Sequence, residues 1–192
     1  MEWLPTPRNA QVSSDRLPFA GCHAIKAPAG WEAAVAPLRT LGEAYGGWTA
    51  FVEHDASLPR EGYHLAVENA RITIRAESPR ATFYACQTLL QAWDGKSIPL
   101  MTVDDHPTLE WRGVVEGFYG VPWSHEARLR MLDFMSAHKM NIYLYAPKDD
   151  PYHRERWREP YPAPDAQRLG ELIRRAQSQF IEFVFCISPG LS

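Results

Sequence analysis

Cysteine is scarce in this chain: its 192 residues include three, Cys22, Cys86 and Cys186, far apart and without a CxxC pair. An odd number at such spacing predicts neither a disulfide framework nor a zinc site. Long apolar runs are also lacking, since no stretch approaches the roughly 20 residues that a bilayer-spanning helix needs. The first residues have no basic region followed by an apolar one, as a secretory signal would, so we expect a cytoplasmic protein.

An excess of charge of either sign is lacking too. The chain has 20 Lys and Arg against 23 Asp and Glu, a formal net charge of -3. Such a balance gives no electrostatic attraction to nucleic acid or to acidic membranes, and we expect neither as a partner. Aromatic residues make up 12% of the chain, with seven Trp, which suits both sugar-binding enzymes and ordinary cores. The sequence leaves the oligomeric state open.

The first half of the chain has the pattern of a small α+β domain, over residues 1–106. Apolar and polar residues alternate at 63–67 and again at 71–75, which predicts two antiparallel strands joined by a turn at 68–70. Ser78 and Pro79 then predict a helix N-cap and its first turn. The helix presents an apolar stripe to the sheet, formed by Phe83, Cys86, Leu90 and Trp93.

The remaining elements of this half are predicted from weaker patterns. We expect short strands at residues 22–25 and 48–52 and a helix at 31–41. Residues 94–107 contain one apolar strand, 98–103, framed by Gly and Pro, and are interpreted as the junction between two domains. The acidic pair Asp104 and Asp105 is interpreted as a turn within that junction.

The second half, residues 107–192, alternates strands with helices. Apolar strands are predicted at 114–118, 141–146 and 183–187, the last followed by Ser-Pro-Gly. Ser124 is expected to cap one intervening helix and Asp165 to open the other. The first helix is expected to bury one face, made of Leu129, Met131, Leu132, Phe134 and Met135, and the second a face made of Leu169, Leu172, Ile173, Ala176 and Phe180. This order predicts a parallel sheet with right-handed crossovers.

A parallel sheet of three strands is small for an independent domain. A closed (β/α)8 barrel takes roughly 250 residues, whereas an open three-stranded sheet exposes an edge and an apolar face. We therefore interpret the chain as an α/β protein in which a small α+β domain precedes the first three βα strands of a truncated TIM barrel.

Two long motifs carry a family resemblance. RGVVEGFYGVPWSHEARL from Arg112, followed by NIYLYAPKDDPYHRERWREPYP from Asn141 and FVFCISPG from Phe183, closely resembles the opening of the catalytic barrel of glycoside hydrolase family 84. This family contains the O-GlcNAcases and bacterial β-N-acetylglucosaminidases. EGYHLAVENARITIRAESPRATFYACQTLLQ, from Glu61, is similar to part of the small domain that precedes that barrel.

The resemblance implies a retaining exo-hydrolase that removes terminal β-linked N-acetylglucosamine from a glycan or glycoprotein. It implies substrate-assisted catalysis, with the acetamido oxygen of the sugar as nucleophile, and neither a cofactor nor a metal. The family's two catalytic aspartates follow the fourth barrel strand, which lies beyond residue 192. We therefore expect no catalytic residue in this chain and no hydrolysis by it alone.

Three substrate-binding candidates follow from the resemblance. Lys148 ends a predicted strand and matches a lysine that contacts the bound sugar; its alternative role is an ion pair with Asp149 or Asp150. Gly117 matches a glycine whose carbonyl accepts a hydrogen bond from a sugar hydroxyl, and Tyr119 matches an aromatic residue that lines the pocket.

Other residues invite a catalytic assignment that we reject. Asp149 and Asp150 follow the second barrel strand rather than the fourth, and we expect them to cap a turn and to pair with Lys148, Arg154 or Arg156. The carboxylate of Glu116 is expected to face into the barrel or to pair with an arginine such as Arg112.

Two clusters receive structural interpretations as well. His153, with Asp150 and Glu155 nearby, matches no metal-site spacing. Ser124, His125 and Glu126 are consecutive at a helix start, which favours capping over a catalytic triad.

A second hypothesis treats the chain as non-catalytic. It is then a carbohydrate-binding module, or a fragment that associates with a second chain to complete the barrel. Lys148 and Gly117 without the opposite wall of the pocket are expected to bind sugar poorly. Submillimolar binding of N-acetylglucosamine by this chain favours the module.

Overall fold

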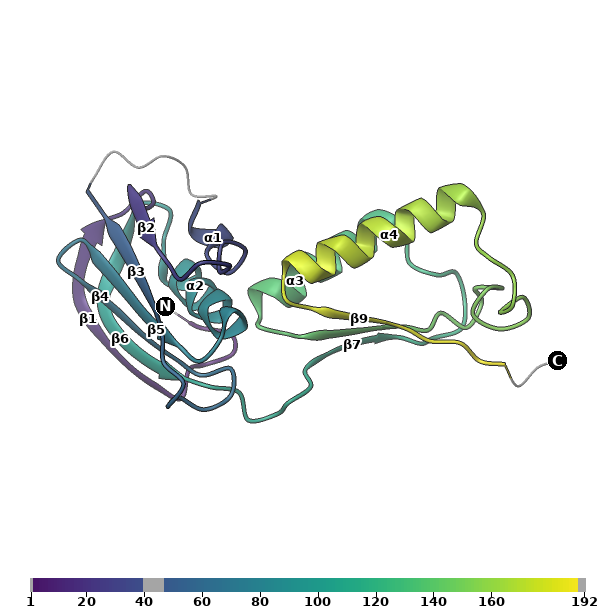
Figure 1. The fold of residues 1–192 in the computed structure, drawn as a ribbon, viewed down its shortest axis with the longest axis horizontal. Helices are drawn as coiled ribbons and strands as arrows, with labels where there is room; N and C mark the ends of the chain where they lie inside the picture. Colours follow the sequence, from purple (N-terminus) through teal and green to yellow (C-terminus); the bar gives the residue numbers. More distant parts are fainter. Residues whose placement is uncertain (1, 40–46, 190–192) are drawn as a thin grey trace. The chain divides into compact units, whose positions relative to one another are not determined.

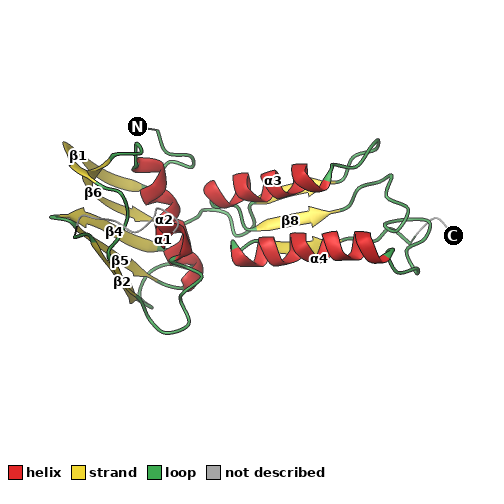
Figure 2. Cartoon of the chain, turned by 90° about the horizontal axis from the view of Figure 1, so that it is seen from above, coloured by secondary structure: helices red, strands yellow, loops and turns green. Residues whose placement is uncertain are grey.

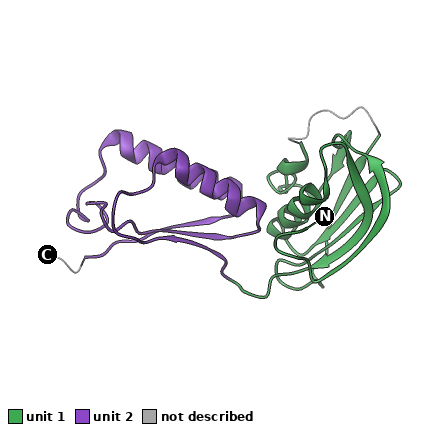
Figure 3. Cartoon of the chain, turned by 180° about the vertical axis from the view of Figure 1, so that it is seen from behind, with its two compact units in different colours: residues 1–110 green, residues 111–192 purple. Residues whose placement is uncertain are grey.

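The computed structural model describes residues 2–39 and 47–189. The chain divides after Glu110 into two compact units, residues 1–110 and 111–192 (Figure 3). Each unit has its own sheet, flanked by its own helices (Figure 1). The observed fold is thus of the mixed α/β class, as predicted. Among the described helices, each is too short or too polar to cross a bilayer.

The first unit is a six-stranded sheet with the spatial order β1-β6-β4-β5-β3-β2. Its strands are β1 (Asn9–Pro18), β2 (Ala24–Lys26), β3 (Thr49–His54), β4 (Tyr63–Glu68), β5 (Arg71–Ala76) and β6 (Ser97–Asp105). Helix α2 (Pro79–Ala92) lies across one face of this sheet (Figure 2). The core between them contains fully buried side chains, among them Leu65, Val67, Ile72, Ile74, Cys86 and Leu89.

Local sequence accounts for the centre of this unit. Strands β4 and β5 pair antiparallel, and their alternate residues are buried, as the period-two pattern predicted. Asn69 and Ala70 form the turn between them with positive φ angles of 45° and 58°. The Ser78 side chain accepts a hydrogen bond from the Ala81 amide, which confirms the predicted N-cap of α2.

The first unit differs from the predictions at its edge strand and in the region expected to be a junction. Strand β1 was not predicted, because its residues are almost all exposed and show no alternation. The apolar strand in residues 94–107 is no junction: it is β6, hydrogen-bonded between β1 and β4. Asp104 and Asp105 accordingly lie in a strand rather than a turn, where Asp105 accepts a 3.0 Å hydrogen bond from the Tyr63 hydroxyl.

The helix predicted at 31–41 begins later than predicted. Within the described residues it forms only α1 (Ala36–Arg39), preceded by turns. Leu41, the predicted end, lies outside the described residues.

The second unit is a parallel three-stranded sheet in the order β7-β8-β9. Its elements are β7 (Gly113–Glu116), α3 (His125–Ala137), β8 (Ile142–Tyr145), α4 (Ala163–Ser178) and β9 (Glu182–Phe185). Both pairings are parallel, as predicted, and their register is continuous. Helices α3 and α4 lie on one face of this sheet (Figures 1 and 2), and the core between them contains Leu132, Met135, Tyr143, Tyr145, Leu172 and Ala176.

Two details of the second unit differ from prediction. Phe134 is 48% exposed rather than part of the buried face, and its ring packs against that of His138, one turn later. Helix α4 begins at Ala163, so that Asp165 lies within its first turn instead of opening it.

The sheet face away from the helices is apolar and open: Val115 is 60% exposed and Val184 36%.

Candidate functional site

The carboxyl ends of β7 and β8 bring the predicted substrate-binding residues together. Gly117 follows β7 directly, Tyr119 lies two residues later, and Lys148 follows β8. The Lys148 amide donates a 3.1 Å hydrogen bond to the Phe118 carbonyl, and the Ala146 amide donates one of 3.0 Å to the Glu116 carbonyl. The β7–β8 ladder thus continues past the strand ends and sets Lys148 beside the segment that carries Gly117.

Tyr119 and Lys148 are both accessible to solvent at this edge. Tyr119 is 71% exposed, and the Arg154 guanidinium lies 5.8 Å from its ring centroid. Lys148 is partly exposed, and within the described part of the chain it joins no ion pair, neither with Asp149 nor with Asp150. Contact of these side chains with a sugar stays a prediction.

Glu116, the last residue of β7, has no exposed surface, and its carboxylate is saturated with hydrogen bonds. It accepts two from Arg128, at 2.9 and 2.7 Å, one of 3.1 Å from the Trp123 amide and one from the Tyr143 hydroxyl. The predicted arginine partner was therefore correct in kind but wrong in identity. Arg112 instead donates from Nε to the Lys139 carbonyl, at 3.1 Å.

The buried hydrogen-bond network around Glu116 changes the pKa values of the groups within it. Burial by itself lowers the pKa of Arg128, but the hydrogen bond to Glu116 raises that pKa overall. Burial, and then donation to Glu116, raises the pKa of the Tyr143 hydroxyl. The pKa values of Arg128 and Tyr143 are thus both raised, and the hydrogen bonds of this network brace β7 against α3 and β8.

The acidic pair after β8 makes contacts that differ from the predicted ones. Asp150 is 7% exposed and accepts 2.7 Å hydrogen bonds from the hydroxyls of Tyr145 and Tyr161, and one of 2.9 Å from the Tyr152 amide. The last of these bonds confirms the predicted turn-capping role. The predicted ion pairs were wrong, because buried tyrosine hydroxyls take the place of a cation. Burial, and then these bonds, raises the pKa of both tyrosines.

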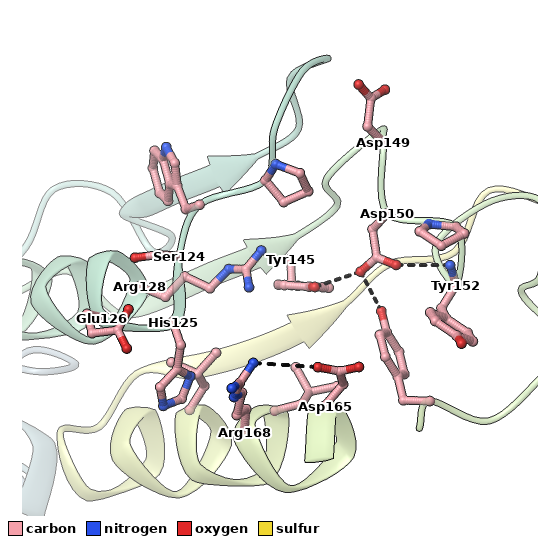
Figure 4. A pocket seen from close by; sticks show the side chains of 16 residues that line it. Ser124, His125, Glu126, Arg128, Tyr145, Asp149, Asp150, Tyr152, Asp165 and Arg168 are labelled. Carbon is pink, nitrogen blue, oxygen red and sulfur yellow. Dashed lines mark hydrogen bonds and ion pairs between the residues drawn. The ribbon is translucent and has the colours of Figure 1, made fainter. Parts of the chain in front are cut away.

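Asp149 points the opposite way from Asp150 (Figure 4). Its Oδ2 accepts a 2.8 Å hydrogen bond from the Gly120 amide, in the segment that follows β7. The two adjacent carboxylates thus face different surroundings and do not form an acid/base pair. Each ties a separate segment to the end of β8.

His153 is 2% exposed and has a structural contact. Its Nδ1 lies 2.7 Å from the Cys186 carbonyl, so Nδ1 carries the proton and donates. The Ser188 amide donates to the His153 carbonyl at 2.8 Å. These bonds fasten the segment after β8 to the end of β9. Within residues 2–39 and 47–189, no cluster of three or more His, Cys, Asp or Glu side chains is arranged to hold a metal ion.

A separate pocket of about 520 Å³ opens between the amino ends of α3 and α4 and the end of β8 (Figure 4). Ser124, His125 and Glu126 line it but form no triad. Ser124 Oγ accepts the Ala127 amide at 3.2 Å, and His125 Nε2 lies 2.9 Å from Glu171, which confirms the capping interpretation. Gly117, Tyr119 and Lys148 do not line this pocket.

Three residues that organise this region were not predicted from the sequence: Arg128, Tyr143 and Tyr145. A signal was present: Tyr143 and Tyr145 are two apart in a short strand and therefore share one face. Arg128 lies one turn after the Ser124 cap, on the helix that must cover β7. A carboxylate at 116 on the covered face requires such a partner.

Two family models match the chain. The model described as beta-N-acetylglucosaminidase matches residues 112–192, and the model described as glycosyl hydrolase family 20, domain 2, matches residues 1–106. The second match spans more than half of the chain.

Curated relatives and solved structures agree with these matches. The chain is 51% identical over 79 residues to protein O-GlcNAcase of Rattus norvegicus, covering 41% of this chain and 9% of that protein. It is 30% identical over 97 residues to N,N'-diacetylchitobiase of Vibrio harveyi, covering 48% of this chain and 11% of that protein. The structure of CpGH84B superposes with a TM-score of 0.82 and 32% identity, over 100% of this chain and 38% of that one.

These matches cover both units but only part of each relative. The chain spans about a tenth of the curated relatives' lengths and 38% of CpGH84B. The chain therefore belongs to the glycosyl hydrolase family 20, domain 2, family through residues 1–106, and over both units it is similar to a structure of glycoside hydrolase family 84.

Proposed function

We propose that this chain forms one wall of the sugar-binding site of a retaining exo-β-N-acetylglucosaminidase of the O-GlcNAcase type. The observation that carries the proposal is the 51% identity to protein O-GlcNAcase over 79 residues, combined with the neighbouring positions of Gly117 and Lys148 at the carboxyl ends of β7 and β8. In parallel α/β folds this edge carries the binding and catalytic groups.

In this proposal each wall residue has a defined task. The Lys148 ammonium donates hydrogen bonds to sugar hydroxyls. The carbonyls of Glu116 and Phe118, on either side of Gly117, accept hydrogen bonds from the amides of Ala146 and Lys148. Because successive carbonyls of an extended chain point in opposite directions, the Gly117 carbonyl faces away from the β8 segment, where it accepts a hydrogen bond from a sugar hydroxyl. The exposed ring of Tyr119 packs against an apolar surface of the ligand.

The sheet of the second unit then supplies the first three strands of a (β/α)8 barrel. The acetamido oxygen of the substrate attacks the anomeric carbon, and the bond to the leaving group breaks. The carboxylates that orient the acetamide and protonate the leaving oxygen belong, in this proposal, to a later barrel strand. This chain contributes binding and orientation and no catalytic residue. A cytoplasmic location stays a prediction from sequence.

A second candidate function is supported by the open apolar face of the sheet, where Val115 is 60% exposed and Val184 36%. Apolar sheet faces are normally covered. The chain then acts as a fragment that completes a barrel with another polypeptide. This candidate predicts association with that polypeptide, whereas the first concerns the sugar contacts themselves.

The test is a titration of the ¹⁵N-labelled chain with N-acetylglucosamine, with glucose as control. We expect amide shifts at Gly117, Tyr119 and Lys148 and a dissociation constant of about 1 mM or weaker, because one wall buries little of a ligand. Unchanged signals at these three residues refute the proposed wall. Submillimolar binding favours an independent carbohydrate-binding module. Turnover of an aryl β-N-acetylglucosaminide by the chain alone contradicts the assignment of catalysis to residues elsewhere.

A further inference from the structure

The segment from Gly117 to Trp123 needs support from outside itself. The side chains in its middle pack little, since Tyr119 is 71% exposed and Val121 90%, whereas Trp123 at its end packs against the core. Gly120 within it has a backbone φ of 103°, which residues other than glycine rarely adopt. A segment with so little apolar burial has low local stability, so its conformation depends on the hydrogen bonds that tie it down.

Two of these hydrogen bonds connect the segment to the residues that follow β8. The Lys148 amide donates to the Phe118 carbonyl at 3.1 Å, and the Gly120 amide donates to Asp149 Oδ2 at 2.8 Å. The two bonds run in opposite directions between the segments, one at Phe118 and Lys148 and the other at Gly120 and Asp149, and together they fix the separation and the register of the segments. Of the two, only the Asp149 bond uses a side chain, and that side chain is charged.

A third hydrogen bond lies at the base of the segment. Glu116 accepts the Trp123 amide at 3.1 Å from its buried position, which closes the segment into a loop with both ends at Glu116. This base belongs to the core network with Arg128. Asp149, in contrast, is exposed and has no part in the core, so its bond to Gly120 contributes little to the stability of the fold.

We propose that Asp149 is a positioning residue: its carboxylate holds the Gly117–Tyr119 segment at a fixed place relative to Lys148. The inference rests on the proposed function, since Gly117, Tyr119 and Lys148 are the proposed sugar contacts. Asp149 itself acts through the Gly120 amide. Without it, the main-chain bond between Lys148 and Phe118 remains, but the segment beyond Phe118 is no longer held at Gly120, and the chain must order it when the sugar binds.

The test compares Asp149→Ala, which removes the acceptor, with Asp149→Asn, which retains an amide oxygen at the same place. Glu155→Ala is the matched control, because Glu155 is an exposed acid in the same segment. Two readouts are measured on the full chain: the ¹H–¹⁵N heteronuclear NOE of residues 118–122 without ligand, and the dissociation constant for N-acetylglucosamine. Thermal unfolding of each variant reports separately on stability.

For Asp149→Ala we expect lower NOE values at Gly120 and Val121, binding about three- to tenfold weaker, and an unfolding temperature close to that of the unchanged chain. Asp149→Asn should recover part of both losses, and Glu155→Ala should change neither. Unchanged NOE values at Gly120 in Asp149→Ala overturn the inference, as does unchanged sugar affinity. If the unchanged chain gives no shift with the sugar, the proposed function fails, while the NOE comparison still decides whether Asp149 orders the segment.

Discussion

The buried pair of Glu116 and Arg128 provides a quantitative test of how this unit is held together. The Glu116 side chain has no exposed surface and that of Arg128 is 13% exposed. Replacing Glu116 by Gln keeps the volume and one acceptor for Tyr143 and Trp123, but it leaves the guanidinium without a counter-charge. Replacing Arg128 by Met leaves the carboxylate as the uncompensated charge.

The expected magnitudes follow from the burial of both partners. Breaking a buried ion pair by removing one member costs about 3–5 kcal/mol of unfolding free energy, because the remaining charge stays desolvated. We expect each single variant, Glu116→Gln and Arg128→Met, to lose that amount. The double variant buries no charge, so it should lose less than the sum of the single losses and no more than either one.

The assay is urea unfolding, followed by hydrogen exchange of peptides from α3 and β8 so that the signal comes from the second unit. Asp133→Asn is the control, since Asp133 forms an ion pair with Arg175 that is about half exposed. That pair should contribute at most about 1 kcal/mol. If the losses of unfolding free energy are additive in the double variant, or if each single loss is as small as that of the control, the buried pair does not stabilise this unit in the way proposed.

Three further predictions concern particular residues. A Cβ on Gly113 would lie 1.7 Å from the Ile142 carbonyl oxygen, so Gly113→Ala should cost about 3 kcal/mol in urea unfolding; full stability of the variant contradicts the close approach. The Ser97 amide, foremost among several donors, lowers the pKa of Asp94 to about 2. Asp94 therefore stabilises the fold above its unfolded pKa, and this contribution disappears as pH falls toward 2, so thermal unfolding of Asp94→Asn and the unchanged chain should converge there. A difference that persists in acid excludes the mechanism. Burial raises the pKa of Cys22 to about 11, and alkylation at neutral pH should be slow in the folded chain and fast in urea; equal rates contradict it.

The fold was predictable where the sequence has a clear period. The alternation over β4 and β5, the Ser78 cap of α2 and the strand–helix order after Trp111 all predicted elements that the structure contains. Strand β1 gave no such signal, because nearly all of its residues are exposed and no face has to be apolar. Strand β6 was visible as a strand, but only its pairing with β1 and β4 shows that it belongs to the first sheet.

The neighbouring positions of the candidate site residues could be predicted from the sequence, whereas several side-chain contacts around them could not. Parallel strand ends meet at one edge, which is why Gly117 and Lys148 are neighbours. For the carboxylates of Glu116 and Asp150, the predicted partners were cationic residues close to them in the sequence. The structure instead gives Asp150 two tyrosine hydroxyls and Glu116 an arginine on the following helix, pairings that depend on packing rather than on sequence distance.

Sugar binding by Lys148 at the end of β8 is the contact on which the proposed function depends most. The most direct measurement is the dissociation constant for N-acetylglucosamine of the unchanged chain and of Lys148→Met, with Lys96→Met, an exposed lysine of the first unit, as control. We expect binding at least about tenfold weaker in Lys148→Met, because a charge-assisted hydrogen bond is lost, and no change in Lys96→Met. Equal affinity in all three proteins contradicts sugar binding by Lys148.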